Sequence, residues 1–205
     1  MPKNEKKLNR SNEQATIRYM VYFLIFLLYL IPIIIVIMHG FSDYFQLFRR
    51  VTALTGISSL FIAIILSSLV RQSKKLFGTV YIKIHHFFSI SGLILITLHP
   101  IIMAIDFGTT SIFALSFSSW DAFLTNGGRP ALYLAYIATI AAVLRKSITK
   151  YWRYFHSIIY FAFIFGAIHG LRMGSNLSSP ILYGLFIIMI AAVIANFFYK
   201  RYLNT

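Results

Sequence analysis

Histidines that lie inside apolar stretches are the residues of this chain best suited to chemistry. The chain has six histidines, and five of them fall in two apolar stretches. These five are His85, His86, His99, His156 and His169. Ionisable side chains are costly inside a membrane, so such residues are candidates for a functional site. The sixth, His39, follows an apolar stretch and is interpreted as an interfacial residue in contact with water.

The spacing of these histidines predicts two pairs of imidazole rings at two depths. His85 and His99 are 14 residues apart, which in an α-helix is a rise of about 21 Å with only about 40° of rotation between the rings. His156 and His169 are 13 residues apart, a rise of about 20 Å, but with the rings about 140° from a common face. Local tightening of this second helix, or different ring rotamers, must make up the difference. Two parallel helices would then supply one ring each at either depth.

Paired imidazoles from facing helices suit haem better than a free metal ion. Zinc and copper normally need a third or fourth protein ligand, and the chain has no cysteine and no carboxylate within these two stretches. Haem brings four nitrogen ligands of its own, and two axial histidines complete a six-coordinate iron that suits electron transfer. The pattern therefore predicts two stacked b-type haems. The alternatives are a proton relay and structural hydrogen bonds between helices.

Only one of the adjacent residues His85 and His86 can bind the inner haem, since neighbours on a helix point about 100° apart. The spacing of 14 residues to His99 favours His85. His86 is then free to bond a haem propionate or a lipid headgroup, together with Arg153 at the same level. Basic residues are expected at the cytoplasmic level of any membrane protein, so topology alone also explains the presence of Arg153.

The histidines are positioned by six apolar runs that contain no Lys, Arg, Asp or Glu. The runs are 20–38, 51–70, 84–105, 130–144, 154–171 and 173–199. A spanning helix needs about 20 apolar residues, and a chain that is 59% hydrophobic and only 12% charged does not suit a soluble domain. We expect an all-α membrane protein in which 19–199 form a six-transmembrane-helix bundle. Residues 1–18 are expected to form a basic cytoplasmic tail, and 200–205 a short second one.

The distribution of positive charge predicts the orientation of this bundle. With six spans, 15 of the 19 Lys and Arg residues fall on the side that holds both termini, and only Arg49, Arg50, Arg129 and Arg172 fall on the other. The positive-inside rule places the basic side in the cytoplasm. We therefore expect a multi-pass protein of the cell membrane with both termini cytoplasmic. The same rule explains the net charge of +14 without nucleic acid as a partner.

At these residues the chain resembles the ferric reductase-like transmembrane domain family, over roughly residues 45–199. The family includes ferric-chelate reductases, NADPH oxidase membrane subunits and the haem-binding subunit of the bacterial methionine sulfoxide reductase system. The likeness rests on His85 with His99, on the stretch from Tyr154 to Gly170, and on Gly128-Arg129-Pro130. It implies a six-helix cytochrome b with an inner haem between His85 and His156 and an outer haem between His99 and His169. The sulfoxide reductase subunit has basic residues where His85 and His86 stand, so His85 favours the two-haem pattern.

The resemblance also raises the question of the electron donor, because full-length ferric reductases and NADPH oxidases carry FAD- and NADPH-binding domains. The chain has no Gly-rich dinucleotide motif after a strand. We expect a separate flavoprotein reductase, a ferredoxin or a quinol to donate electrons, with flavin either on the cytoplasmic side or on that partner. The acceptor is expected to be a ferric chelate, oxygen or an outer-side oxidoreductase. The competing hypothesis is a haem-free small membrane transporter or assembly factor that uses its histidines as polar or proton-relay groups.

Overall fold

Helices make up all of the regular structure in the described part of the chain. The computed structural model describes the backbone of residues 3–202 and the side chains of residues 12–201. The α-helices are α1 (Lys3–Met38), α2 (Tyr44–Ser68), α3 (Val70–Phe77), α4 (Tyr81–Asp106), α5 (Trp120–Thr125), α6 (Gly128–Val143), α7 (Trp152–Ser157), α8 (Ile159–Met173) and α9 (Pro180–Tyr202). Short 3₁₀-helices occur at η1 (Gly78–Val80), η2 (Ser111–Phe113), η3 (Leu144–Lys146) and η4 (Ser175–Ser178). The all-α prediction is confirmed for this part of the chain.

Five helical segments in the described residues are long and apolar enough to cross a membrane. They are Asn12–Met38, Tyr44–Ser68, Val70–Asp106, Trp152–Met173 and Pro180–Arg201. These segments indicate a membrane protein in contact with lipid, and they correspond to five of the six predicted runs. The remaining run corresponds to α6, whose 16 residues extend over about 24 Å. This is shorter than the roughly 30 Å of a bilayer hydrocarbon core.

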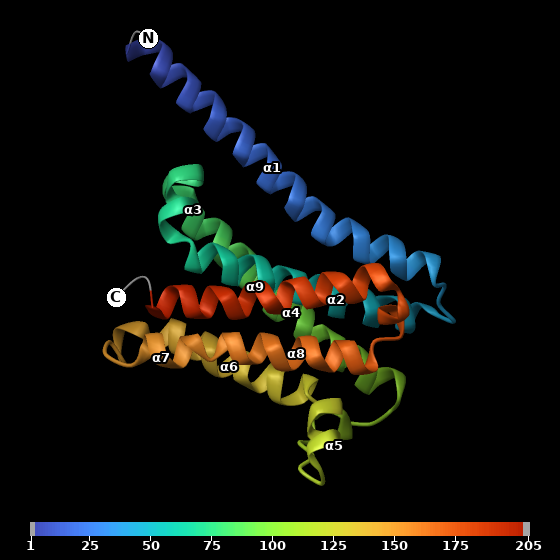
Figure 1. Ribbon diagram of the computed structural model, residues 1–205. Coiled ribbons are helices and arrows are strands. Elements are labelled where there is room, and N and C mark those ends of the chain that lie inside the picture. The colour runs from blue at the N-terminus through green and yellow to red at the C-terminus, as the bar shows by residue number, and fades with distance from the viewer. Residues whose placement is uncertain (1–2, 203–205) are drawn as a thin grey trace.

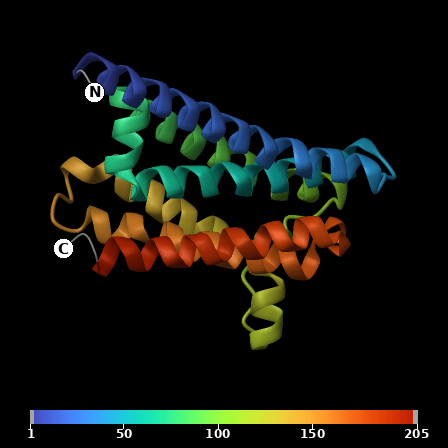
Figure 2. The same ribbon diagram turned by 45° about the horizontal axis from the view of Figure 1, so that its top comes forward.

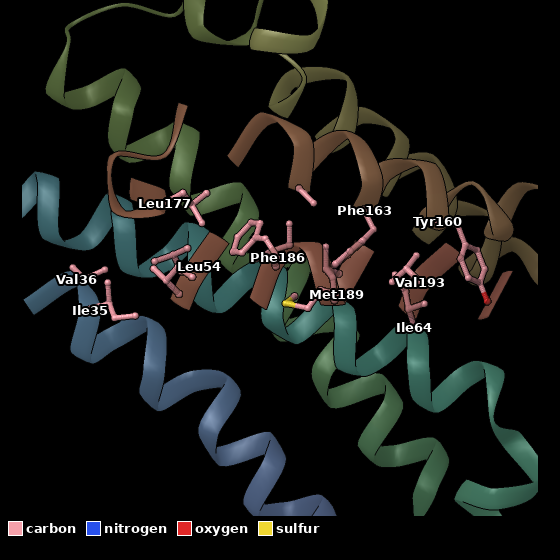
Figure 3. Packing of buried hydrophobic residues seen from close by; sticks show 14 residues of the cluster. Ile35, Val36, Leu54, Ile64, Tyr160, Phe163, Leu177, Phe186, Met189 and Val193 are labelled. Carbon is pink, nitrogen blue, oxygen red and sulfur yellow. The ribbon is translucent and has the colours of Figure 1, made fainter. Parts of the chain in front are cut away.

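The longer helices α2, α4, α8 and α9 lie side by side with α6, whereas α1 slants away from them (Figure 1). A second view shows the same arrangement, with the start of α1 and the end of α9 toward one end of the bundle (Figure 2). Between α2 and α8, the side chains of Phe186, Met189 and Val193 from α9 fill the core (Figure 3). Helix α1 contributes to this core mainly near its end, through Ile35 and Val36.

Two boundaries differ from the sequence prediction. Helix α1 begins at Lys3, inside the segment predicted as a cytoplasmic tail; the side chains of residues 1–11, and residues 203–205 of the second tail, lie outside the described part. The last run was predicted to begin at residue 173, but α9 begins at Pro180. Four of the six residues between Met173 and Pro180 are Ser or Asn, which favour turns because their side chains bond to nearby backbone. Proline is favoured in the first helical turn, where its missing N–H costs nothing.

Helix α2 begins at a capped turn outside the apolar segment. The Asp43 carboxylate accepts the backbone N–H of Gln46 at 2.8 Å, and the Gln46 side chain accepts the N–H of Ser42 at 2.8 Å. The bond from the Gln46 N–H lowers the pKa of Asp43, because it favours the charged carboxylate. The cap fixes the start of the helix that carries Arg49 and Ala63, whose carbonyls belong to the candidate site.

Helices α2 and α4 approach each other closely at two glycines. A Cβ atom on Gly56 would lie 2.8 Å from Cγ2 of Ile96, and one on Gly92 would lie 2.9 Å from Cδ2 of Leu60 and 3.1 Å from its backbone nitrogen. Neither position has room for a side chain unless the helices move apart. This close packing determines which backbone atoms of α2 face the histidines of α4.

We predict that Gly56→Val and Gly92→Val each destabilise the protein by about 1–3 kcal/mol, the usual cost of overpacking. Thermal unfolding in detergent, followed by circular dichroism, measures the effect. Gly184→Ala is the matched control, since a Cβ there meets nothing within 4 Å. Equal melting temperatures for all three variants would contradict the proposed packing.

Candidate functional site

Four of the histidines donate a ring hydrogen bond to a backbone carbonyl of the neighbouring helical segment. The donor atom is Nδ1 in each case. The pairs are His85 with Ala63 (3.0 Å), His99 with Arg49 (2.9 Å), His156 with Ala138 (3.0 Å) and His169 with Thr125 (2.6 Å). These are the four residues predicted as axial ligands. His39, by contrast, directly follows α1 and bonds to the carbonyl of Ile35 in that helix.

The four bonds follow two antiparallel registers. His85 and His99 on α4 are 14 residues apart, and so are their acceptors on α2, in the opposite order. His156 and His169 are 13 residues apart, and so are their acceptors in α6 and at the end of α5. The neighbouring segment therefore sets the orientation of each ring. His156 and His169, which are 13 residues apart, need not lie on one face of a regular helix for this.

The local tightening expected between His156 and His169 is present. Helix α7 ends at Ser157 and α8 begins at Ile159. At the junction the N–H of Ile158 donates to the carbonyl of Phe155, three residues back, at 3.1 Å. Such a bond is typical of a 3₁₀ turn, which rotates more per residue than an α-helix.

The hydrogen-bond partner determines which ring nitrogen is free. A backbone carbonyl only accepts, so Nδ1 carries the hydrogen and Nε2 of the neutral ring carries the lone pair. In the described residues, none of the four Nε2 atoms has a hydrogen-bond partner. Histidines that bind metals show this arrangement, with the far nitrogen held by a carbonyl or carboxylate.

His99 and His169 line one cavity of about 500 Å³ between α2, α4, α6 and α8. We call it the His99–His169 cavity. Its walls are mostly apolar and include Ile57, Leu132 and Phe163. The volume lies within the range of about 300–1,000 Å³ that is typical of pockets for ligands and cofactors.

His85 and His156 line a second cavity, of about 40 Å³, which we call the His85–His156 cavity. Small side chains, among them Ala63 and Ala138, form part of its wall. The volume is well below the size of a typical cofactor pocket, so a macrocycle there requires the helices to separate. The two cavities are neighbours along the bundle, because Leu60 and Ala135 line both.

Glycine at position 128 leaves the Cδ2–Nε2 edge of the His169 ring uncovered. A Cβ atom on Gly128 would lie 2.7 Å from Cδ2 and 2.9 Å from Nε2 of that ring. At Gly127, a Cβ would lie 2.9 Å from the carbonyl oxygen of Leu124. Two consecutive glycines thus allow the start of α6 to pass directly beneath the imidazole.

Part of the wall of the His99–His169 cavity is polar. Arg49 lines the cavity and forms an ion pair with Asp106 at 2.5 Å. Arg129 also lines it and donates to the carbonyl of Ala114 at 2.5 Å. Asn176 is another lining residue and is only 3% exposed. We call the part of the wall formed by Arg49, Arg50, Arg129 and Asn176 the polar mouth.

The other predicted site residues lie away from both cavity walls. His86 is exposed, with its ring centre 5.7 Å from that of His85, and it lines neither cavity. Its position favours His85 over His86 as the axial residue. Arg153 is exposed and lies over the Trp152 ring at 5.7 Å. A propionate contact for His86 or Arg153 stays a prediction.

Three residues of interest were missed from the sequence. Lys200 was counted only for topology, but it lies close enough to His85 and Arg153 for their charges to interact. Asn176 was placed inside a predicted span, although the polar stretch 175–179 could have indicated a connection there. Gly128 was noted only as part of a motif, since the sequence gives no sign of the ring above it.

No protein-family model, curated protein or solved structure matches this chain. Within residues 12–201, no group of three or more His, Asp or Glu side chains gathers to form a metal site. The candidate site therefore consists of two histidine pairs, each of which needs further ligands from elsewhere to hold a metal.

We predict that Gly128→Ala weakens binding of haemin by about 10- to 100-fold, the range found when a group that orients a metal ligand is lost. The added methyl group would cover Nε2 of His169 and displace the ring. A titration of haem-free protein followed by the Soret absorbance measures the affinity, with Gly184→Ala as the control. Unchanged affinity in Gly128→Ala would show that His169 does not bind the iron.

Proposed function

We propose that the protein is a six-helix membrane cytochrome b that transfers electrons across the membrane through two bis-histidine haems. His99 and His169 would hold the outer haem, and His85 and His156 would hold the inner haem. The observation that carries the proposal is the shared arrangement of these four rings. Each is held by Nδ1 to a backbone carbonyl and lines a common cavity with its partner.

The fit to haem differs between the two sites. At the outer site, the cavity of about 500 Å³, its apolar walls and the glycine below His169 all suit a macrocycle. At the inner site, the ring pair suits haem, but the cavity of about 40 Å³ must widen. We therefore expect the outer haem to bind more tightly and to be the last one lost on purification.

Haem iron with two imidazole ligands gains and loses one electron without binding substrate at the metal. The protein's own residues supply the rest of the function. The carbonyls of α2, α5 and α6 hold the imidazole rings, and apolar side chains such as Ile57 and Phe163 exclude water. The polar mouth offers positive charge where the outer haem meets the surface.

Six spans and cytoplasmic termini complete the proposal. Helix α6 becomes the sixth span if the bilayer thins or if Arg129 and Arg145 extend to the headgroups, as is usual for short spans. The start of α1 and the end of α9 lie toward one end of the bundle (Figures 1 and 2), and that end carries most of the basic residues. Membership of the ferric reductase-like family, proposed from the histidine pattern, agrees with this topology.

A separate flavoprotein reductase, ferredoxin or quinol would reduce the inner haem, with flavin on that partner or bound at the cytoplasmic face. The basic end of the bundle would attract an acidic donor over long range. The acceptor would be a ferric chelate, oxygen or an outer-side oxidoreductase. Such a protein is an oxidoreductase itself or the membrane subunit of one.

A haem-free role is the second candidate, because the histidine bonds join neighbouring helices and so could serve as structural contacts alone. On that basis the protein would be a small transporter or an assembly factor. The cavity that each ring pair lines would then have no purpose, which is why we favour the haem proposal.

We predict a reduced-minus-oxidised spectrum of b type for the purified protein. His99→Ala and His169→Ala should each remove about one haem per chain in a pyridine haemochrome assay, because each removes an axial ligand of one iron. His85→Ala and His156→Ala should remove the second haem where present. His39→Ala is the control and should change nothing. Absence of a b-type signal in the wild-type protein would refute the proposal and leave the haem-free role.

The topology can be measured independently. Reporter domains fused after residue 38 and after residue 125 should fold on the outer side, and reporters in 145–150 or after Tyr202 should stay cytoplasmic. A reporter at 145–150 on the same side as one after residue 125 would show that α6 does not span the membrane, and the five-span arrangement would replace six.

A further inference from the structure

Two ion pairs occur among the described side chains, and both lie beside the outer histidine bonds. Arg49 on α2 pairs with Asp106 on α4. Arg172 on α8 pairs with Asp121 on α5. These are the same segments that the two outer histidines join, α4 with α2 and α8 with α5. Each outer histidine bond is therefore accompanied by a charged contact between the same two helices.

Arg49 contacts α4 at two points. Its backbone carbonyl accepts the Nδ1 hydrogen of His99 at 2.9 Å, and its guanidinium donates to the Asp106 carboxylate at 2.5 Å. The guanidinium also lies over the Phe107 ring, 5.0 Å from its centre. His99 and Asp106 are seven residues apart, so the helix places them on one face with a rise of about 10 Å between them. The ion pair therefore fixes the residue whose carbonyl orients the ring.

The second outer bond has the same kind of support. Helix α5 projects from the side of the bundle (Figures 1 and 2), and its six residues are too few to form a stable helix alone. Asp121 lies in its first turn and pairs with Arg172 of α8. Thr125 is its last residue, and its carbonyl accepts from His169. The ion pair and the ring bond thus lie about one helical turn apart and hold α5 on α8 together.

We propose that Asp106 and Asp121 are positioning residues, because each carboxylate holds in place the backbone carbonyl that orients an outer histidine ring. Asp106 lies on the histidine helix, whereas Asp121 lies on the acceptor helix. What the two share is thus the cross-link, and not a charge on the histidine helix. The pair of Asp106 with Arg49 is the stronger, since its side chains are 19% and 23% exposed, against 39% and 73% in the other pair, and solvent weakens exposed ion pairs.

Nuclear magnetic resonance of the full chain, prepared without haem and with isotope-labelled histidine, tests the proposal directly. The shifts of the ring nitrogens report which of them carries the hydrogen, and in the wild-type protein His99 should carry it on Nδ1. Asp106→Asn keeps the size of the side chain and removes its charge. We expect His99 alone to exchange between its two tautomers in this variant. Asp121→Asn should do the same to His169, with a smaller change.

Two further variants separate positioning from general stability. Arg49→Asp combined with Asp106→Arg reverses the ion pair and should restore the tautomer of His99. Asp43→Asn is the matched control, because its carboxylate caps the same helix α2 but forms no ion pair among the described residues. This control should lower the melting temperature, as loss of a cap does, and leave His99 unchanged. The proposal is overturned by an unchanged His99 in Asp106→Asn, by an equal change in the control, or by no recovery in the reversed pair.

The consequence for haem rests on the proposed function. Asp106→Asn should weaken binding of haemin by about 3- to 10-fold, less than the roughly 10- to 100-fold found when a direct partner of a metal ligand is lost. The reversed pair should restore the affinity. A released His99 ring in Asp106→Asn, together with no haemin binding in the wild-type protein, would refute the haem function and support the positioning role. An unchanged ring with normal haemin binding would overturn the positioning role and leave the haem function.

Discussion

The hydrogen bond from a histidine Nδ1 to a carbonyl of the adjacent helix is the interaction on which the candidate site depends. It fixes the ring orientation and the tautomer together, because a carbonyl cannot donate. It also ties each ring to the helix register, so a shift of α4 along α2 by one residue would release His85 and His99 at once. The close contacts at Gly56 and Gly92 resist such a shift. Packing in the middle of the bundle therefore controls the orientation of histidine rings at two points along it.

The histidines and the helices that carry them could be predicted from the sequence, since both depend on local pattern. Apolar runs give spans because lipid cannot satisfy an exposed backbone, and five such segments agree with the prediction. The spacing of His85 and His99 places two rings on one face by helix geometry alone. The choice of His85 over His86 follows the same geometry and agrees with the cavity wall.

What the sequence could not predict depends on which segments meet in space. The acceptor carbonyls have no side-chain signature, so the registers of α4 with α2 and of α8 with α6 are visible only in three dimensions. Gly128 is one glycine among 11 until His169 is seen above it. Asn176 looked like a tolerated polar residue within a span, and only the polar connection before Pro180 places it at the cavity. The difference in size between the two cavities has no counterpart in the pattern at all.

Leu60 and Ala135 form a partition shared by the two cavities, and neither side chain carries a group that could relay a proton. An electron can tunnel through a thin hydrocarbon layer of this kind, whereas a hydrogen ion would need a chain of waters or hydroxyls. Under the proposed function, an electron passing between the two sites would therefore move along the bundle without an accompanying proton. Its transfer across the membrane would work with or against the membrane voltage, at about 2.3 kcal/mol per unit charge for every 100 mV.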